Sequence, residues 1–360
     1  SPHIFRFGAM PTTAAGKKIE VVHDVCYHPL GPAVASSAQF LDVYVPPEAK
    51  EENASLPVVV FLHGGGWRRG SRRSNIFHFF QNVGLVLADQ GFVAVLPSYR
   101  KSLPYAPWLL GMLGATALTL TALPLLFRRQ STRSTSSSVG ALAGVWGGLA
   151  LILRQLIRWV SPGVRHPAHL EDCARAVGWV QQGGTRAFGG DPGKVVLLGN
   201  SAGAHLASLL ALDASKASTE IPSPLRGLIA ISGIYCGQRF YQSWLMRHMF
   251  GYVFDDHPSW DDCFPLGRCP DPSDPSRPDS SSQLEGLCPV LLINAAFDVG
   301  LQPHAEDFAK RLRQCGAQVS GPVVLPGTDH FRMLPLLGRT QRSGGRVSSR
   351  EDRELLPLIS

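Results

Sequence analysis

The chain has 360 residues, of which 44% are hydrophobic and 17% charged, and a formal net charge of +7. This apolar content can bury a sizeable core, which excludes a disordered chain as well as collagen-like, coiled-coil and small disulfide-linked proteins. Residues 101–165 carry the whole charge excess, because they contain seven Lys and Arg and no Asp or Glu. The charge therefore belongs to an apolar segment and does not predict a surface for nucleic acid.

Apolar runs typical of strands alternate with helical patterns along most of the chain. Strands are predicted at 18–26, 39–46, 57–62, 92–98, 194–199, 226–232, 289–295 and 319–325. Helices are predicted at 76–90, 167–183, 202–213, 303–315 and 351–359. This alternation favours an α/β fold with a mostly parallel, doubly wound sheet of about eight strands, the first two forming an antiparallel edge. The Asp-, Pro- and Ser-rich residues 255–286 are predicted to form a long loop.

One segment, residues 103–165, interrupts the alternation. Residues 107–127 contain no charged side chain, and a helix of that length, about 31 Å, would cross a bilayer core. A polar turn at 128–138 separates them from a second apolar run at 139–160. We predict a main domain formed by residues 1–102 and 166–360, with an inserted hydrophobic helical hairpin at 103–165. The hairpin is expected to lie in a membrane, with the endoplasmic reticulum or Golgi favoured, and a hydrophobic lid is the alternative.

The strongest motif is GNSAG at 199–203, which follows a predicted strand and precedes a predicted helix. A G-x-S-x-G in this strand–turn–helix context is typical of a nucleophile elbow. The flanking glycines allow a tight turn and a close approach of neighbouring backbone, and the turn lifts the serine above the sheet edge. Ser201 is therefore the candidate nucleophile.

A second motif, HGGGW at 63–67, directly follows another predicted strand. Glycine-rich backbone at such a place can direct N–H groups at an oxyanion without obstruction by side chains. Gly64 and Gly65 are the candidate donors of an oxyanion hole, with the backbone N–H of Ala202 as the third. His63 is expected to have a structural role.

A serine hydroxyl needs a base and an acid that orients it, and in this fold the chain order is serine, acid, histidine. Asp298 follows the strand PVLLINAAF, and His330 follows the strand that ends in VVLP. Parallel strands would bring both residues to the sheet edge that carries the serine. Asp329 is the alternative acid, although it adjoins the histidine. Glu306 and Asp307 lie in a predicted helix and are expected to face solvent.

Structural roles are expected for most other polar residues. His205 should pack beneath the elbow. Asp172 should brace its own helix, at 167–183, which precedes the elbow. His248, His257 and His304 show no metal-ligand spacing. The Ser-His-Asp mechanism needs neither a metal nor an organic cofactor, so we expect none. Seven cysteines without a CxxC pair indicate mostly buried thiols, with a Cys263–Cys269 disulfide left open.

Together these segments resemble the α/β-hydrolase superfamily, in its HGGGW branch of hormone-sensitive-lipase-like carboxylesterases, kynurenine formamidases and isoprenylcysteine methylesterases. The matching segments are HGGGW at 63–67, SYR at 98–100, HPAHLEDCARAVGWV at 166–180, FGGDPGKVVLLGNSAGAHLA at 188–207, ISGIY at 231–235, FD at 297–298 and DHF at 329–331. The resemblance implies an α/β-hydrolase fold and a Ser-His-Asp triad. The chain departs from it in the long segment after SYR and in Asn200, which replaces the residue usual before the serine.

The expected function is that of a serine carboxylesterase acting on an apolar, membrane-derived ester, such as a prenylcysteine methyl ester or an acyl lipid. The insertion leaves the sheet at the edge where active sites of open α/β sheets lie, which would place membrane lipid beside the pocket. An arylformamidase or amidase of the kynurenine formamidase type is one alternative, since the same triad opens both bonds. A catalytically silent membrane binding protein is the other. The residues do not predict the oligomeric state.

Overall fold

The computed structural model describes residues 6–7, 18–73, 80–102, 163–215, 221–254, 260–272, 284 and 286–334. The chain divides into two units, residues 1–100 with 165–360 and residues 101–164, and the features below belong to the first. The predicted hairpin at 103–165 lies outside the described residues except for 163–165, so its boundaries and membrane location stay predictions. In the described part of the chain, no helix is long and apolar enough to cross a membrane.

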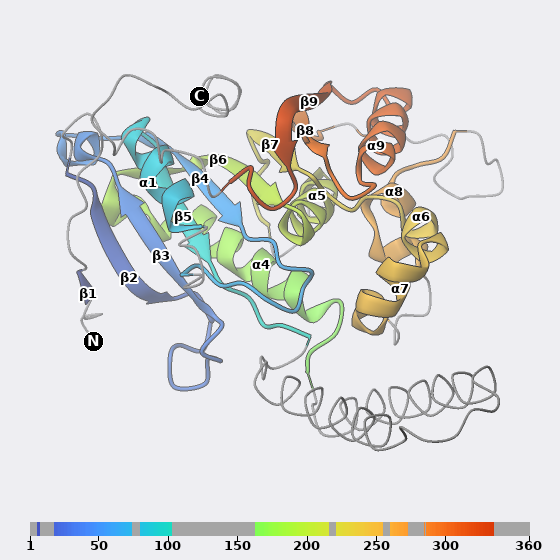
Figure 1. The fold of residues 1–360 in the computed structure, drawn as a ribbon. Helices are drawn as coiled ribbons and strands as arrows, with labels where there is room; N and C mark the ends of the chain where they lie inside the picture. Colours follow the sequence, from blue (N-terminus) through green and yellow to red (C-terminus); the bar gives the residue numbers. More distant parts are fainter. Residues whose placement is uncertain are drawn as a thin grey trace, which may run out of the picture. The chain divides into compact units, whose positions relative to one another are not determined.

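A single mixed sheet forms the centre of the fold (Figure 1). Its strands are β1 (Arg6–Phe7), β2 (Glu20–Cys26), β3 (Phe40–Val45), β4 (Leu56–Leu62), β5 (Val93–Pro97), β6 (Gly190–Asn200), β7 (Gly227–Ile231), β8 (Val290–Phe297) and β9 (Val319–Asp329). They lie in the order β1-β2-β3-β5-β4-β6-β7-β8-β9. Pairing is antiparallel from β1 to β5 and parallel from β5 to β9. The predicted α/β fold and antiparallel edge are confirmed, and the two-residue β1 adds to the strands expected from sequence.

Apolar residues on both faces of the strands explain why the sheet is covered on both sides. In β4, Val58, Val60 and Leu62 join the core under one helical layer, while Val59 and Phe61 join the core under the other. The first layer consists of α4 (Ala168–Trp179), α5 (Ala202–Ser215) and α9 (Gln302–Gln314). The second contains α1 (Gln81–Asp89) (Figure 1). The predicted helix at 351–359 lies outside the described residues.

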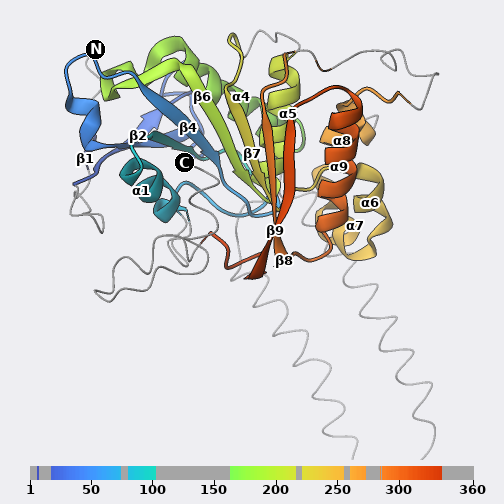
Figure 2. The ribbon, with the colours of Figure 1, turned by 90° about the horizontal axis from the view of Figure 1, so that it is seen from above.

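Short helices that the sequence patterns did not predict gather beside α9 (Figure 2). They are α6 (Gly237–Gln242), α7 (Trp244–Phe250) and α8 (Pro265–Arg268). Single helical turns also occur at Pro47–Lys50, Val180–Gly184, Arg186–Phe188, Gly251–Val253 and Asp261–Cys263. The expectation of a loop throughout 255–286 was therefore wrong where residues are described, because Cys263 and Phe264 are buried and Pro265 starts a helical turn. Residues 255–259, 273–283 and 285 lie outside the described residues.

None of the seven cysteines forms a disulfide, so the Cys263–Cys269 bridge that the sequence left open is not formed. Both side chains are buried in the apolar core, and Cys269 Sγ donates to the Pro265 carbonyl at 3.3 Å. Burial raises the pKa of the Cys263 thiol to about 12, because the thiolate would be poorly solvated there. These cysteines thus behave as small apolar side chains, as predicted.

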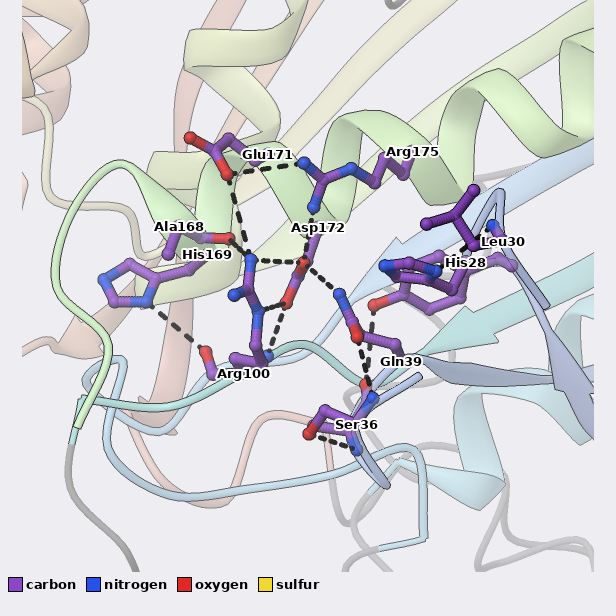
Figure 3. A network of polar contacts seen from close by, with 12 residues as sticks. His28, Leu30, Ser36, Gln39, Arg100, Ala168, His169, Glu171, Asp172 and Arg175 are labelled. Carbon is purple, nitrogen blue, oxygen red and sulfur yellow. Dashed lines mark hydrogen bonds and ion pairs between the residues drawn. The ribbon is translucent and has the colours of Figure 1, made fainter. Parts of the chain in front are cut away.

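A buried carboxylate joins α4 to the loop after β5 (Figure 3). The Asp172 side chain is fully buried, and its oxygens accept from Arg100 Nε at 2.8 Å, Arg100 Nη2 at 2.9 Å and the Arg100 backbone N–H at 2.9 Å. Gln39 Nε2 donates at 2.8 Å and Arg175 Nη1 at 3.1 Å. Because these donors come from the loop after β5, the β2–β3 connection and α4 itself, the predicted bracing role of Asp172 is confirmed and extends beyond its helix.

Replacing Asp172 by Asn should lower the free energy of unfolding by about 2–4 kcal/mol, because the half-buried Arg100 guanidinium then loses the charge of its fully buried partner. Urea denaturation of the two chains measures this. Arg175→Ala is the matched control: it removes one half-buried partner at i,i+3 and should cost less than about 1 kcal/mol. Equal losses for the two variants would contradict the prediction.

Candidate active site

Ser201 lies in a tight turn between β6 and α5. Its φ of +54° is in the left-handed region, which is rare for a residue with a Cβ and typical of a strained functional turn. The Ser201 backbone N–H donates to the Ile231 carbonyl at the end of β7 at 2.8 Å. A Cβ on Gly203 would overlap the Leu62 carbonyl of β4, so only glycine allows this approach. The elbow predicted from GNSAG is therefore present in the backbone.

Three side chains from different strand ends form one hydrogen-bonded chain. His330 Nε2 lies 3.1 Å from Ser201 Oγ, and His330 Nδ1 lies 2.7 Å from Asp298 Oδ1. Because a carboxylate only accepts, Nδ1 carries the proton, and Nε2 is left to accept from the serine hydroxyl. The His330 backbone N–H donates to the Phe297 carbonyl at 3.1 Å, which ties the end of β9 to β8. The structure thus brings together the three residues expected from sequence.

The other acidic candidates are engaged elsewhere. Asp329 Oδ1 accepts the backbone N–H groups of Phe331 and Arg332, each at 3.0 Å, and so holds the turn that presents the histidine. Asp307 pairs with Arg239 at the surface. The preference for Asp298 over Asp329 agrees with this geometry.

Asp298 is itself held by residues that the motifs did not identify. Its Oδ2 accepts from Asn294 Nδ2 at 2.6 Å and from the Ala295 backbone N–H at 3.2 Å. Gln302 Nε2, at the start of α9, donates to the carbonyls of Ala295 and Ala296 and so braces the same strand end. One sequence signal existed, because Asn294 is the single polar residue in the run VLLINAAF.

The glycine loop after β4 lies directly beside the elbow. A Cβ on Gly64 would be 2.9 Å from the Asn200 carbonyl oxygen and 3.2 Å from Ser201 Cβ. Gly65 has a φ of +119°, which a side chain would make costly. Ala202 is the first residue of α5, where a backbone N–H has no acceptor within the helix. The structure therefore places the backbone of Gly64 beside Ser201, with Gly65 next in the loop, and Ala202 directly after the serine at the start of α5.

An aromatic cluster supports this loop. Trp67, which ends the HGGGW motif, is fully buried and packs edge-to-face at 5.0–6.2 Å between ring centroids against His205, Phe240, Phe250 and Phe254. His63 is also buried, stacks on Tyr99 at 4.2 Å and donates from Nδ1 to the Gly64 carbonyl at 2.8 Å. His63 thus has the structural role expected of it.

Beneath the elbow, His205 connects the glycine loop to the short helices. Trp67 Nε1 donates to His205 Nδ1 at 3.3 Å, and His205 Nε2 donates to the Cys263 carbonyl at 2.8 Å. Both ring nitrogens are therefore used by the neutral form. Burial lowers the pKa of His205 to about 3, because the imidazolium would be desolvated there. The expectation that His205 packs under the elbow is confirmed.

No group of His, Cys, Asp and Glu suited to a metal ion occurs within the described ranges. His304 accepts the Cys236 backbone N–H at 3.1 Å, and burial lowers its pKa to about 4. His257 and the side chain of His248 lie outside what the structure describes.

Comparison with known families agrees with the fold. A family model described as the alpha/beta hydrolase fold matches residues 159–333, which contain the elbow, Asp298 and His330. A second model, BD-FAE, matches residues 41–108, which contain the glycine loop. The chain has the α/β-hydrolase fold.

Individual relatives of this α/β-hydrolase carry ester-hydrolase names. It is similar to carboxylic ester hydrolase LipN of Mycobacterium tuberculosis, at 31% identity over 51% of this chain and 50% of LipN. It is also similar to isoprenylcysteine alpha-carbonyl methylesterase ICME of Arabidopsis thaliana, at 28% identity over 42% of this chain and 37% of the relative. The chain thus spans half of LipN and less of the plant protein. Esterase B of Lactobacillus rhamnosis has the same fold, with a TM-score of 0.58 at 18% identity, covering 95% of this chain and 86% of that one.

The neutral His205 of this α/β-hydrolase predicts a pH-dependent stability. Its pKa is lower in the folded chain, about 3, than the 6.5 of an exposed histidine, so the unfolded chain takes up a proton between these values. Stability is therefore complete above pH 6.5 and falls as the pH falls toward 3, with a loss at pH 5 of about 2 kcal/mol from this residue.

The variant His205→Gln keeps a donor and an acceptor but cannot titrate. We expect its free energy of unfolding to fall about 2 kcal/mol less than that of the parent between pH 7 and pH 5, as measured by urea denaturation. An identical pH dependence in the two chains would show that His205 is not the group responsible.

Proposed function

We propose that this α/β-hydrolase is a serine carboxylesterase, with Ser201 as nucleophile, His330 as general base and acid, and Asp298 as the residue that orients the imidazole. The observation that carries the proposal is the continuous hydrogen-bonded chain from Ser201 Oγ through the imidazole to the buried Asp298 carboxylate, at 3.1 and 2.7 Å. The ester-hydrolase names of the relatives support the same reaction.

The geometry supports a two-step reaction through an acyl-enzyme. Ser201 Oγ attacks the ester carbonyl as its proton passes to His330 Nε2, and the imidazolium then protonates the leaving alcohol. Water repeats the sequence on the acyl-enzyme and releases the acid. Asp298 stays ionised and holds the Nδ1–H, which keeps Nε2 directed at the serine.

Negative charge on the carbonyl oxygen would be stabilised by backbone donors. Gly64 lies beside the serine, Ala202 follows it at the start of α5, and Gly65 is the third candidate. Fixed backbone N–H groups need no reorganisation as charge develops, and loss of one donor typically lowers turnover by about 10²–10³. Each step therefore uses groups of the protein and water, without a cofactor.

An apolar ester is the substrate class that the rim of this site favours. Phe331 is 69% exposed and lies edge-to-face against the His330 ring, with centroids 5.1 Å apart. Val299, adjacent to Asp298, is 54% exposed despite its apolar side chain. Large exposed apolar residues beside a catalytic group are typical of a binding surface for an apolar ligand. The name of the plant methylesterase agrees with a prenylcysteine methyl ester, and an acyl lipid has the same chemistry.

The nucleophile can be tested directly with a fluorescent fluorophosphonate, which labels an activated serine. We expect the parent chain to be labelled, and Ser201→Ala and His330→Ala to lose labelling, because the first removes the attacking oxygen and the second its base. Turnover of methyl esters should fall by about 10³-fold or more in each. A folded parent chain that is not labelled would favour the binding-protein alternative, and faster turnover of N-formylkynurenine than of any ester would favour the formamidase.

The rim can be tested with Phe331→Ala on acetate esters of short and long alkyl alcohols. His330 protonates the leaving alcohol, so the neighbouring ring should contact that group, and kcat/KM should fall about tenfold for long alcohols with little change for short ones. Val324→Ala is the control, because Val324 is also exposed and apolar but lies earlier in β9. A loss that is equal for both alcohols would exclude Phe331 from substrate selection.

A further inference from the structure

We infer that Asn294 is a positioning residue for the reaction: it holds the Asp298 carboxylate in the orientation that directs Oδ1 at His330. The inference rests on the proposed function, because it assigns a role within the same hydrogen-bonded chain. Neither motif of the sequence contains Asn294, and its side chain does not contact the serine or the imidazole in any described hydrogen bond.

The placement of Asn294 is unusual for its strand. It lies in β8, where every other side chain of VLLINAAF is apolar, and it is 1% exposed. Its Nδ2 donates to Asp298 Oδ2 at 2.6 Å, four residues later in the chain. A hydrogen bond this short to an ionised acceptor belongs to the strong, charge-assisted class.

The contacts of the two carboxylate oxygens show what this bond does. Oδ2 accepts from Asn294 and from the Ala295 backbone N–H, whereas Oδ1 accepts from His330 Nδ1. Rotation of an aspartate about χ2 is soft, and either oxygen could otherwise turn toward the imidazole. Two donors on one oxygen remove that freedom, and the remaining oxygen faces the histidine at 2.7 Å.

The other end of the carboxamide argues against a purely structural role. Asn294 Oδ1 is buried and has no hydrogen-bond partner among the residues that the structure describes. A buried acceptor without a partner costs stability by an amount comparable with what a hydrogen bond to a charged group contributes, so Asn294 adds little net stability to the fold. The asparagine is explained by its donor to Asp298, which matters for the reaction rather than for the core.

The test compares Asn294→Ala with the parent chain and with Thr185→Val. Thr185 is a suitable control because it is fully buried, its Oγ1 also lacks a described partner, and it precedes β6 at the end of that strand opposite to Ser201. Steady-state kinetics on a methyl ester, the rate of fluorophosphonate labelling and the melting temperature are measured for each.

We expect Asn294→Ala to lower kcat and the labelling rate by about 10- to 100-fold, the effect of a lost hydrogen bond to a charged group, with KM little changed. Its melting temperature should stay as close to the parent as that of Thr185→Val, which should keep full activity. A parent-like kcat and labelling rate in Asn294→Ala, or a loss of melting temperature without a loss of kcat, would overturn the inference.

A second variant, Asn294→Asp, gives a pH-dependent readout. Its carboxyl can donate to Asp298 only while protonated, and two adjacent carboxylates share a proton until the pH rises. The other titratable groups that interact with Asp298 are His330 and the Tyr235 phenol. The kcat of Asn294→Asp relative to the parent should therefore fall as the pH rises, whereas that of Asn294→Ala should stay constant.

Labelling of the parent chain distinguishes a failure of the proposed function from a failure of the role of Asn294. A parent chain that is not labelled at Ser201 overturns the proposed function and this inference with it. A labelled parent with a fully active Asn294→Ala overturns only the role of Asn294.

Discussion

The close approach of the elbow to β4 is the constraint on which the site depends. Gly203 of α5 lies against the Leu62 carbonyl so closely that no side chain fits between them. This contact keeps the first turn of α5 close to β4, the strand before the glycine loop, and Ser201 in the turn has a left-handed conformation. Ser201, the N–H of Ala202 at the start of α5 and the backbone of the glycine loop are therefore close together, because the backbones of α5 and β4 are in contact.

The order of the strands brings Asp298 and His330 to the same edge of the sheet as Ser201. β4, β6, β7, β8 and β9 are adjacent and parallel, so their carboxyl ends share one edge. Backbone bonds then continue beyond the strands: Ser201 to Ile231, Ser232 to Ile293 and His330 to Phe297. The residues of the site are therefore positioned by extensions of the sheet rather than by independent loops, and rigid elements hold such geometry better than loops do.

Two buried polar groups, Asp172 and His205, are hydrogen-bonded in the form that each adopts. Asp172 is surrounded by donors from three elements, and His205 uses both ring nitrogens in its neutral form. Asn294 differs, because one end of its amide is bonded and the other is not. The bonded end of Asn294 lies on the acid of the hydrogen-bonded chain, so its contact with Asp298 explains the residue better than packing does.

By itself, the sequence determined the α/β fold and which residues could share the reacting edge, because GNSAG, HGGGW and the strand-end Asp298 and His330 are local patterns with a local physical meaning. Only the tertiary structure decided that Asp329 holds a turn instead of the imidazole, that Asn294 holds Asp298, and that short helices pack around Trp67. The first two features depend on the direction of side chains at strand ends, and the third depends on contacts between distant segments; no periodicity of the chain encodes either.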